Sequence, residues 1–111
     1  MGSSPVINVV AVQCQSEVEE KFNKWYDEIH IPMLFKHKGM KKVTRYKILK
    51  ESEEYPSYLA IYEFENRQAY EAYTTSPELA AGIAEMKETW KEGGFDIRWR
   101  VQYEAMKIWE K

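Results

Sequence analysis

The segment 6–13, VINVVAVQ, is the feature that most constrains the fold of this 111-residue chain. Apolar and mostly β-branched side chains stand at both its odd and its even positions, a pattern that indicates a strand buried on both faces. The run 58–65 likewise carries aromatic residues on one face and Leu59 and Ile61 on the other. A chain of this length builds one core. We therefore expect its own helices to cover one face of a sheet and a second copy to cover the other.

A helix is predicted to follow the first strand. Ser16-Glu17-Val18-Glu19 fits a capping box, which marks a helix start. The buried stripe is predicted as Val18, Phe22, Trp25 and Ile29, with Tyr26 at its edge. Pro32 lacks a backbone donor, so this helix should end, kink or restart between His30 and Met33, before Gly39 terminates the segment.

The remaining elements complete a known order. Runs 41–50 and 58–65 predict a β-hairpin, Asn66 is expected to cap a short helix, and Ser76-Pro77-Glu78 to open another. Gly93-Gly94 should break that helix before a long strand, 97–109. The order matches the ferredoxin-like split β-α-β repeat. We predict an α+β fold over residues 5–111, a four-stranded antiparallel sheet with helices on one face that dimerises into an α/β barrel, and residues 1–4 as disordered or non-native.

Several classes of function are disfavoured. A formal charge of −2 offers no strong field for nucleic acid. The glycines do not have nucleotide-loop spacing, and one cysteine and two histidines do not have metal-site spacing, so no cofactor and no metal are expected. Cys14 has no disulfide partner, and neither a signal peptide nor an apolar span is apparent. These observations predict a cytoplasmic protein without a membrane or nucleic-acid partner.

The candidate chemistry centres on residues 25–32, WYDEIHIP. Tyr26 and His30 are four residues apart, so a helix brings a phenol and an imidazole together. Histidine exchanges protons near neutral pH, and Pro32 predicts an irregular backbone beside it. The alternative is that His30 is a structural residue bonded to a nearby carbonyl and that Tyr26 fills the core.

Strand aromatics provide a candidate binding surface. Five of them occupy alternating positions and could line one face as an aromatic pocket: Tyr46, Tyr58, Tyr62, Trp99 and Tyr103. The alternative is a plain hydrophobic core. Arg45, Arg98 and Arg100 are expected to point the other way, into a dimer space.

The segment 22–47, FNKWYDEIHIPMLFKHKGMKKVTRYK, resembles the EthD-like branch of the dimeric α/β-barrel superfamily. The residues that carry the resemblance are a Trp-Tyr pair, His-x-Pro, a glycine and an Arg-Tyr pair: Trp25, Tyr26, His30, Pro32, Gly39, Arg45 and Tyr46. The resemblance implies a ferredoxin-like subunit that dimerises through its sheet. Relatives in the superfamily include cofactor-free oxygenases, cyclases, lactone isomerases and haem-degrading enzymes, so the fold constrains function poorly.

Three functions remain open at this point. The first is a metal-free enzyme of cyclase, isomerase, lyase or oxygenase type acting on an aromatic or lactone-like substrate. Its expected catalytic residues are His30, Tyr26 and Tyr46, and its expected substrate-binding residues are Trp25, Tyr62, Trp99 and Tyr103. The second is a non-catalytic ligand-binding or stress-associated homodimer. The third is a haem-binding or haem-degrading protein, for which Asn8 lies on the first strand but the later helix carries no histidine.

Overall fold

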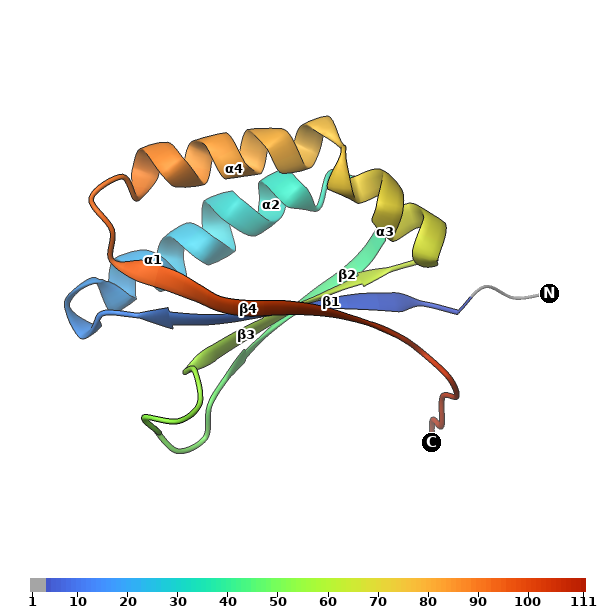
Figure 1. Cartoon of the computed structure of the whole chain (residues 1–111), viewed down its shortest axis with the longest axis horizontal. Helices are drawn as coiled ribbons and strands as arrows, with labels where there is room; N and C mark the ends of the chain where they lie inside the picture. Colours follow the sequence, from blue (N-terminus) through green and yellow to red (C-terminus); the bar gives the residue numbers. More distant parts are fainter. Residues whose placement is uncertain (1–3) are drawn as a thin grey trace.

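A four-stranded antiparallel sheet forms one layer of the molecule (Figure 1). The computed structural model describes residues 4–111, so the expectation for residues 1–3 lies outside the described part. The strands are β1 (Val6–Cys14), β2 (Met40–Lys47), β3 (Tyr58–Phe64) and β4 (Phe95–Glu104), in the order β2-β3-β1-β4. The predicted strand 97–109 is too long, because the chain leaves the sheet after Glu104.

Helices form the second layer, and all of them cover the same face of the sheet (Figure 1). The first group is the 3₁₀ turn η1 (Ser16–Val18), α1 (Glu19–Trp25), the π-helical turn η2 (Tyr26–His30) and α2 (Ile31–Leu34). The second group is α3 (Arg67–Thr74) and α4 (Pro77–Thr89). The predicted ferredoxin-like fold class is confirmed. No helix in the described range 4–111 is both long and apolar enough to cross a bilayer.

The π-helical turn η2 changes which side chains the first helix buries. A π turn contains more residues than an α turn and therefore rotates the following side chains around the axis. Ile29 is 43% exposed, whereas His30 is only 8% exposed. The prediction that Ile29 belongs to the buried stripe is therefore wrong. The irregular backbone expected near Pro32 is present, and the α-helical pattern resumes at Ile31.

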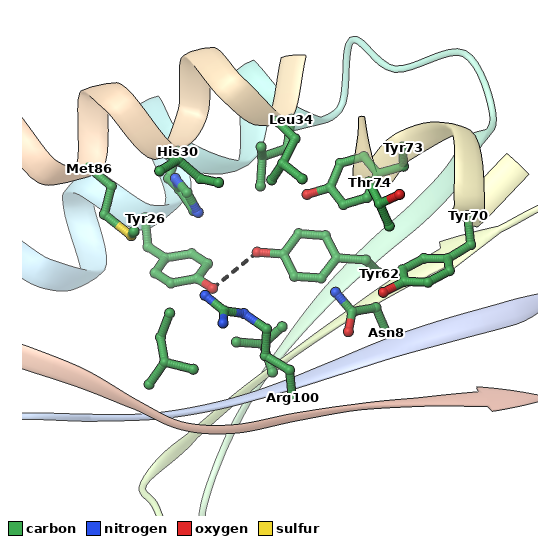
Figure 2. Close-up of a pocket in the computed structure, with 14 residues that line it drawn as sticks. Asn8, Tyr26, His30, Leu34, Tyr62, Tyr70, Tyr73, Thr74, Met86 and Arg100 are labelled. Carbon is green, nitrogen blue, oxygen red and sulfur yellow. Dashed lines mark hydrogen bonds between the residues drawn. The ribbon is translucent and has the colours of Figure 1, made fainter. Parts of the chain in front are cut away.

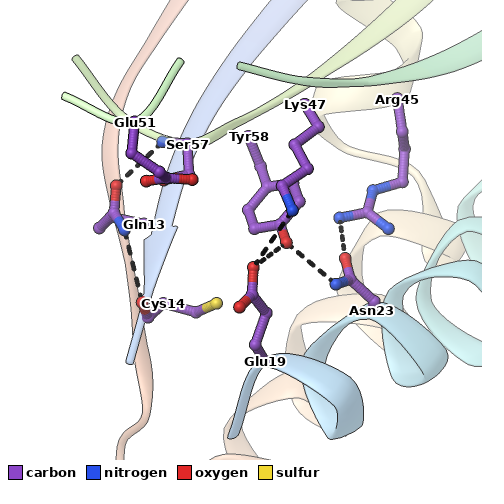
Figure 3. A network of polar contacts seen from close by, with 9 residues as sticks. All are labelled: Gln13, Cys14, Glu19, Asn23, Arg45, Lys47, Glu51, Ser57 and Tyr58. Carbon is purple, nitrogen blue, oxygen red and sulfur yellow. Dashed lines mark hydrogen bonds and ion pairs between the residues drawn. The ribbon is translucent and has the colours of Figure 1, made fainter. Parts of the chain in front are cut away.

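The predicted capping box does not form. Ser16 Oγ donates to the carboxylate of Glu17, and the structure gives it no bond to a helix N–H. Glu19 instead accepts a short hydrogen bond from the Tyr58 hydroxyl and lies 4.0 Å from Lys47 Nζ (Figure 3). A partner on β3 therefore replaces the local partner that a capping box requires.

The two caps predicted for the second helical group are present. Asn66 accepts a bond from the backbone N–H of Ala69 at 2.7 Å, and Ser76 accepts one from Leu79 at 3.2 Å. Each side chain satisfies an otherwise unpaired donor of the first turn. Gly93 and Gly94 adopt positive φ angles of 84° and 129° and end α4 as expected.

Gly82 allows α4 to lie close to α2. A Cβ atom at this position would stand 2.6 Å from Leu34 Cδ2, and the Leu34 side chain is itself only 2% exposed. Overpacking a buried contact costs about 1–3 kcal/mol. Alanine otherwise gains about 1 kcal/mol over glycine in a helix.

We therefore expect Gly82→Ala to lower the free energy of unfolding, measured by chemical denaturation, although alanine is the better helix former. Ala84→Gly, on the exposed side of the same helix, measures the propensity difference alone. If Gly82→Ala gained the amount that Ala84→Gly lost, the close approach of α4 to Leu34 would be refuted.

The strand register divides the sheet residues between two faces. On β1, Asn8, Val10 and Val12 point toward the helices, on what we call the helix face. Side chains of the other parity lie on what we call the open face: Ile7, Val9, Ala11, Tyr46, Leu59, Ile61, Trp99, Val101 and Tyr103. The β4 members of this set are exposed although they are large and apolar. The described chain thus leaves an apolar sheet face uncovered.

Candidate functional site

A cavity of about 280 Å³ lies between the helices and the helix face of the sheet (Figure 2). Its walls come from both layers. They include Asn8 of β1, Tyr26 and His30 of η2, Tyr62 of β3, Met86 of α4 and Arg100 of β4. Most of the lining is apolar or aromatic, with a few polar groups directed inward, which is the usual composition of a small-molecule site.

Two tyrosine hydroxyls meet at the floor of this cavity. The oxygens of Tyr26 and Tyr62 are 3.0 Å apart, and the two residues are 4% and 2% exposed (Figure 2). Burial raises the pKa of Tyr26, and burial together with Tyr26 raises the pKa of Tyr62 well above its usual value. Both phenols are therefore neutral at pH 7. One hydroxyl donates to the other, and the second proton is left to donate to a ligand.

Arg45 lies over the ring of Tyr26. Its guanidinium carbon lies 4.6 Å from the Tyr26 ring centroid. The same guanidinium donates to Asn23 at 2.8 Å and to Asp27 at 2.9 Å, and Figure 3 shows it reaching across to α1. The prediction that Arg45 points into a dimer space is wrong, because Arg45 pairs with Ala60 on the helix face.

His30 is buried without a hydrogen bond at one of its ring nitrogens. Among residues 4–111, Nδ1 has no partner, which is uncommon for an enclosed polar atom. The ring stacks on Trp25 at a centroid distance of 4.7 Å, and Trp25 Nε1 is in turn anchored to Glu85 at 2.8 Å. Burial lowers the pKa of His30 to about 4, a shift that nearby Glu85 opposes and Arg100 adds to. The imidazole is therefore neutral at pH 7.

The structure brings together Tyr26, His30 and Tyr62 of the expected site. Trp25 does not line the cavity and lies behind His30 as its stacking partner. The alternative, in which His30 is purely structural, requires a hydrogen bond from His30 to a nearby carbonyl. Within residues 4–111, His30 Nδ1 makes no such bond.

Tyr46, Trp99 and Tyr103 lie on the open face, across the sheet from His30. They pair with Leu59, Ala11 and Ile7, whereas Tyr62 pairs with Asn8 on the helix face. The expectation that all the strand aromatics share one surface is therefore wrong. Within one chain, Tyr46, Trp99 and Tyr103 cannot touch a ligand held beside His30, because the sheet separates them.

Arg100 is the functional candidate that the sequence interpretation placed on the wrong face. It pairs with Val10 and lines the cavity. A register shift between Ala11 and Val12 is the cause, because it puts Ile97 on the helix face although Trp99 lies on the open face. A strand that alternated strictly through residues 97–105 would place Ile97 and Trp99 on the same face. No local sequence signal marks this bulge.

The residues considered for haem divide between the cavity and its surroundings. Asn8 lines the cavity and accepts a 2.9 Å bond from Gln102. His37 is outside it, with Nε2 3.2 Å from the Ala69 carbonyl and Nδ1 3.6 Å from Glu78. In the described range, no three His, Cys, Asp or Glu side chains group into a candidate metal site.

Comparison with known proteins supports the fold. A family model described as a domain of unknown function, DUF4286, matches residues 6–98. A search of curated proteins gives no significant match.

Solved structures with the same fold cover nearly the whole chain. An ethyl tert-butyl ether D (EthD) family protein from Bacillus halodurans has 13% identity and a TM-score of 0.65, covering 93% of this chain and 99% of its own. HapK from Hahella chejuensis has 7% identity and a TM-score of 0.73, with coverages of 96% and 97%. A dimeric ferredoxin-like protein of unknown function from Bacteroides fragilis has 22% identity and a TM-score of 0.63, with coverages of 91% and 96%. The fold implied by the EthD-like resemblance is thus confirmed.

Proposed function

The chain belongs to the family of the domain of unknown function DUF4286, and we propose that it is a metal-free enzyme that moves a proton on a small aromatic or lactone-like carbonyl compound. His30 is the base, and the Tyr26–Tyr62 pair is the hydrogen-bond donor to the carbonyl oxygen. The observation that carries this proposal is a neutral imidazole, buried with an unpaired nitrogen, in the same cavity as a neutral phenol pair.

The groups complement each other chemically. His30 removes a proton from the carbon next to the carbonyl, and the electron pair moves onto the carbonyl oxygen. The free proton of the tyrosine pair stabilises that oxygen as negative charge develops. Return of the proton from His30 to a different atom completes an isomerisation. Attack by the carbanion on a second carbonyl carbon of the substrate opens that C=O π bond, and the proton from His30 neutralises the new alkoxide, which completes a cyclisation. Both reaction types therefore share this first step.

Cavity size favours a ligand of one or two rings. A volume of about 280 Å³ lies just below the roughly 300–1,000 Å³ typical of ligand sites. A macrocycle the size of haem would have to displace wall residues, and His37 is not among those walls. The haem alternative is therefore less well supported than a small organic substrate.

We also propose that the protein is a homodimer joined through the open faces. The uncovered apolar side chains of Tyr46, Trp99, Val101 and Tyr103 support this arrangement. The fold neighbour from Bacteroides fragilis is described as dimeric. A twofold contact joins two identical surfaces and covers both.

Deuterium exchange tests the proposed reaction without knowledge of the product. Aromatic ketones and lactones incubated with the protein in D₂O should exchange the hydrogens next to the carbonyl faster than in buffer. Ile83→Trp fills the cavity wall and should slow this exchange at least about tenfold, because near-attack positioning is lost. The control is Ala84→Trp, which adds the same side chain at the next residue of α4, on the exposed side of the helix. It should leave the exchange rate unchanged.

Binding without exchange would give the opposite conclusion. If the panel compounds shift the protein's NMR signals at cavity residues and none exchanges above the buffer rate, the proposed reaction is wrong. The non-catalytic ligand-binding homodimer would then be the supported function.

A further inference from the structure

Arg100 differs from the other arginines of the chain in having no partner. Arg45 is paired with Asp27, Arg67 with Glu104 and Arg98 with Asp96. Arg100 has no hydrogen bond or ion pair with any residue of the described range 4–111. Its guanidinium nevertheless lines the cavity and lies below the Tyr26 hydroxyl (Figure 2).

The cavity walls provide nothing to neutralise this charge. None of the lining side chains is an aspartate or a glutamate. His30 is neutral at pH 7 because its pKa is lowered, and burial raises the pKa values of Tyr26, Tyr62 and Tyr73. Glu85, the acidic group near His30, is engaged by Trp25 and Thr89. Arg100 is thus the one formal charge among the lining residues.

We infer that the ligand of this cavity carries a carboxylate, which Arg100 binds at the cavity mouth while the apolar body of the ligand lies among the aromatic walls. A guanidinium matches a carboxylate with two parallel N–H···O bonds, and charged bonds of this kind are stronger than neutral ones. The inference rests on the proposed function in one respect: the carboxylate ligand is the compound on which His30 acts.

The position of Arg100 also connects ligand charge to the base. The guanidinium is one of the groups that lower the pKa of His30. A carboxylate bound to Arg100 offsets that positive charge, so the pKa of His30 should rise when the ligand is anionic and stay lower when it is neutral. The anionic substrate thus makes His30 a stronger base than it is in the empty cavity.

The test compares 2-naphthoate with 2-naphthamide, which have nearly the same shape and differ in charge. Titration followed by NMR should show that the parent protein binds the carboxylate at least about tenfold more tightly. Arg100→Gln should abolish this preference and leave the naphthamide affinity unchanged. Arg98→Gln removes the same charge from the same strand, at a side chain paired with Asp96 outside the cavity, and should keep the preference.

The outcomes separate this inference from the proposed reaction. Equal affinities in the parent protein, or a preference that survives Arg100→Gln, would overturn the role of Arg100. A carboxylate preference that depends on Arg100 supports it, even if no compound undergoes deuterium exchange and the proposed reaction fails. Equal exchange rates for a neutral ketone and for the matched keto acid in the parent protein would support the reaction and reject the carboxylate.

Discussion

His30→Gln is expected to lower the rate of deuterium exchange by at least about 100-fold, because a positioned general base contributes roughly 10²–10⁴-fold. Glutamine is similar in size and polar, but its amide does not accept a proton at neutral pH. The affinity for the ligand should change little, because the Tyr26–Tyr62 pair and Arg100 remain in place. The measurement is exchange rate and affinity on the same compound, parent against variant.

The pH profile gives a second signature of the same group. With a pKa of about 4, His30 is neutral at pH 6–8, so the exchange rate of the parent should be flat there and fall only as the pH approaches 4. An exchange rate that His30→Gln leaves unchanged would remove His30 from the mechanism, whatever its burial.

Stability should show the same ionisation with a defined sign. The unfolded chain binds a proton at its histidines near the usual pKa of 6.5, whereas folded His30 does so only near 4. The unfolded state therefore holds more protons between these values, and the free energy of unfolding falls as the pH drops from 6.5 toward 4. Above pH 6.5 this contribution vanishes. In His30→Gln the fall over this range should be smaller.

The fold could be predicted from sequence because it depends on patterns that the structure leaves intact. Strand β1 is apolar at odd and even positions alike, and its two sets of side chains do lie on two different faces. The helix caps and the turn depend on local interactions, since each involves residues only a few positions apart in the sequence. They are the caps at Asn66 and Ser76 and the turn at the glycine pair 93–94. The helix order and the antiparallel sheet follow from these signals together.

The candidate site could be predicted only in part, because two irregularities displace the periodic pattern. The π turn exchanges Ile29 for His30 on the buried side, and the bulge opposite Ala11 and Val12 separates Ile97 from Trp99. Each inserts one residue into an otherwise regular element, which moves every later side chain to a new direction. Tyr26, the first residue of the π turn, lies in the buried position that was predicted, whereas Arg100, which follows the bulge in β4, lies on the face opposite to the predicted one.

Val101→Glu is expected to convert the proposed dimer into monomers. Val101 stands opposite Val9 on the open face, in the edge strand β4, and is exposed in the single chain. Twofold symmetry would bury two glutamates in an apolar contact at once, and each buried unpaired carboxylate costs several kcal/mol. The dissociation constant should rise about 1,000-fold or more, equivalent to at least about 4 kcal/mol. Sedimentation equilibrium across micromolar concentrations measures it.

Ala84→Glu adds the same side chain and charge on the exposed outer side of α4, and it should leave the parent's association unchanged. A monomeric parent would reject the dimer itself, and a Val101→Glu protein that associates like the parent would show that the contact lies away from the open face.

Ligand binding should not depend on the dimer. Because the cavity lining comes from a single chain on the helix face, monomeric Val101→Glu should still prefer 2-naphthoate to 2-naphthamide. Loss of that preference together with the dimer would mean that the partner's sheet holds β4, and with it Arg100, in position.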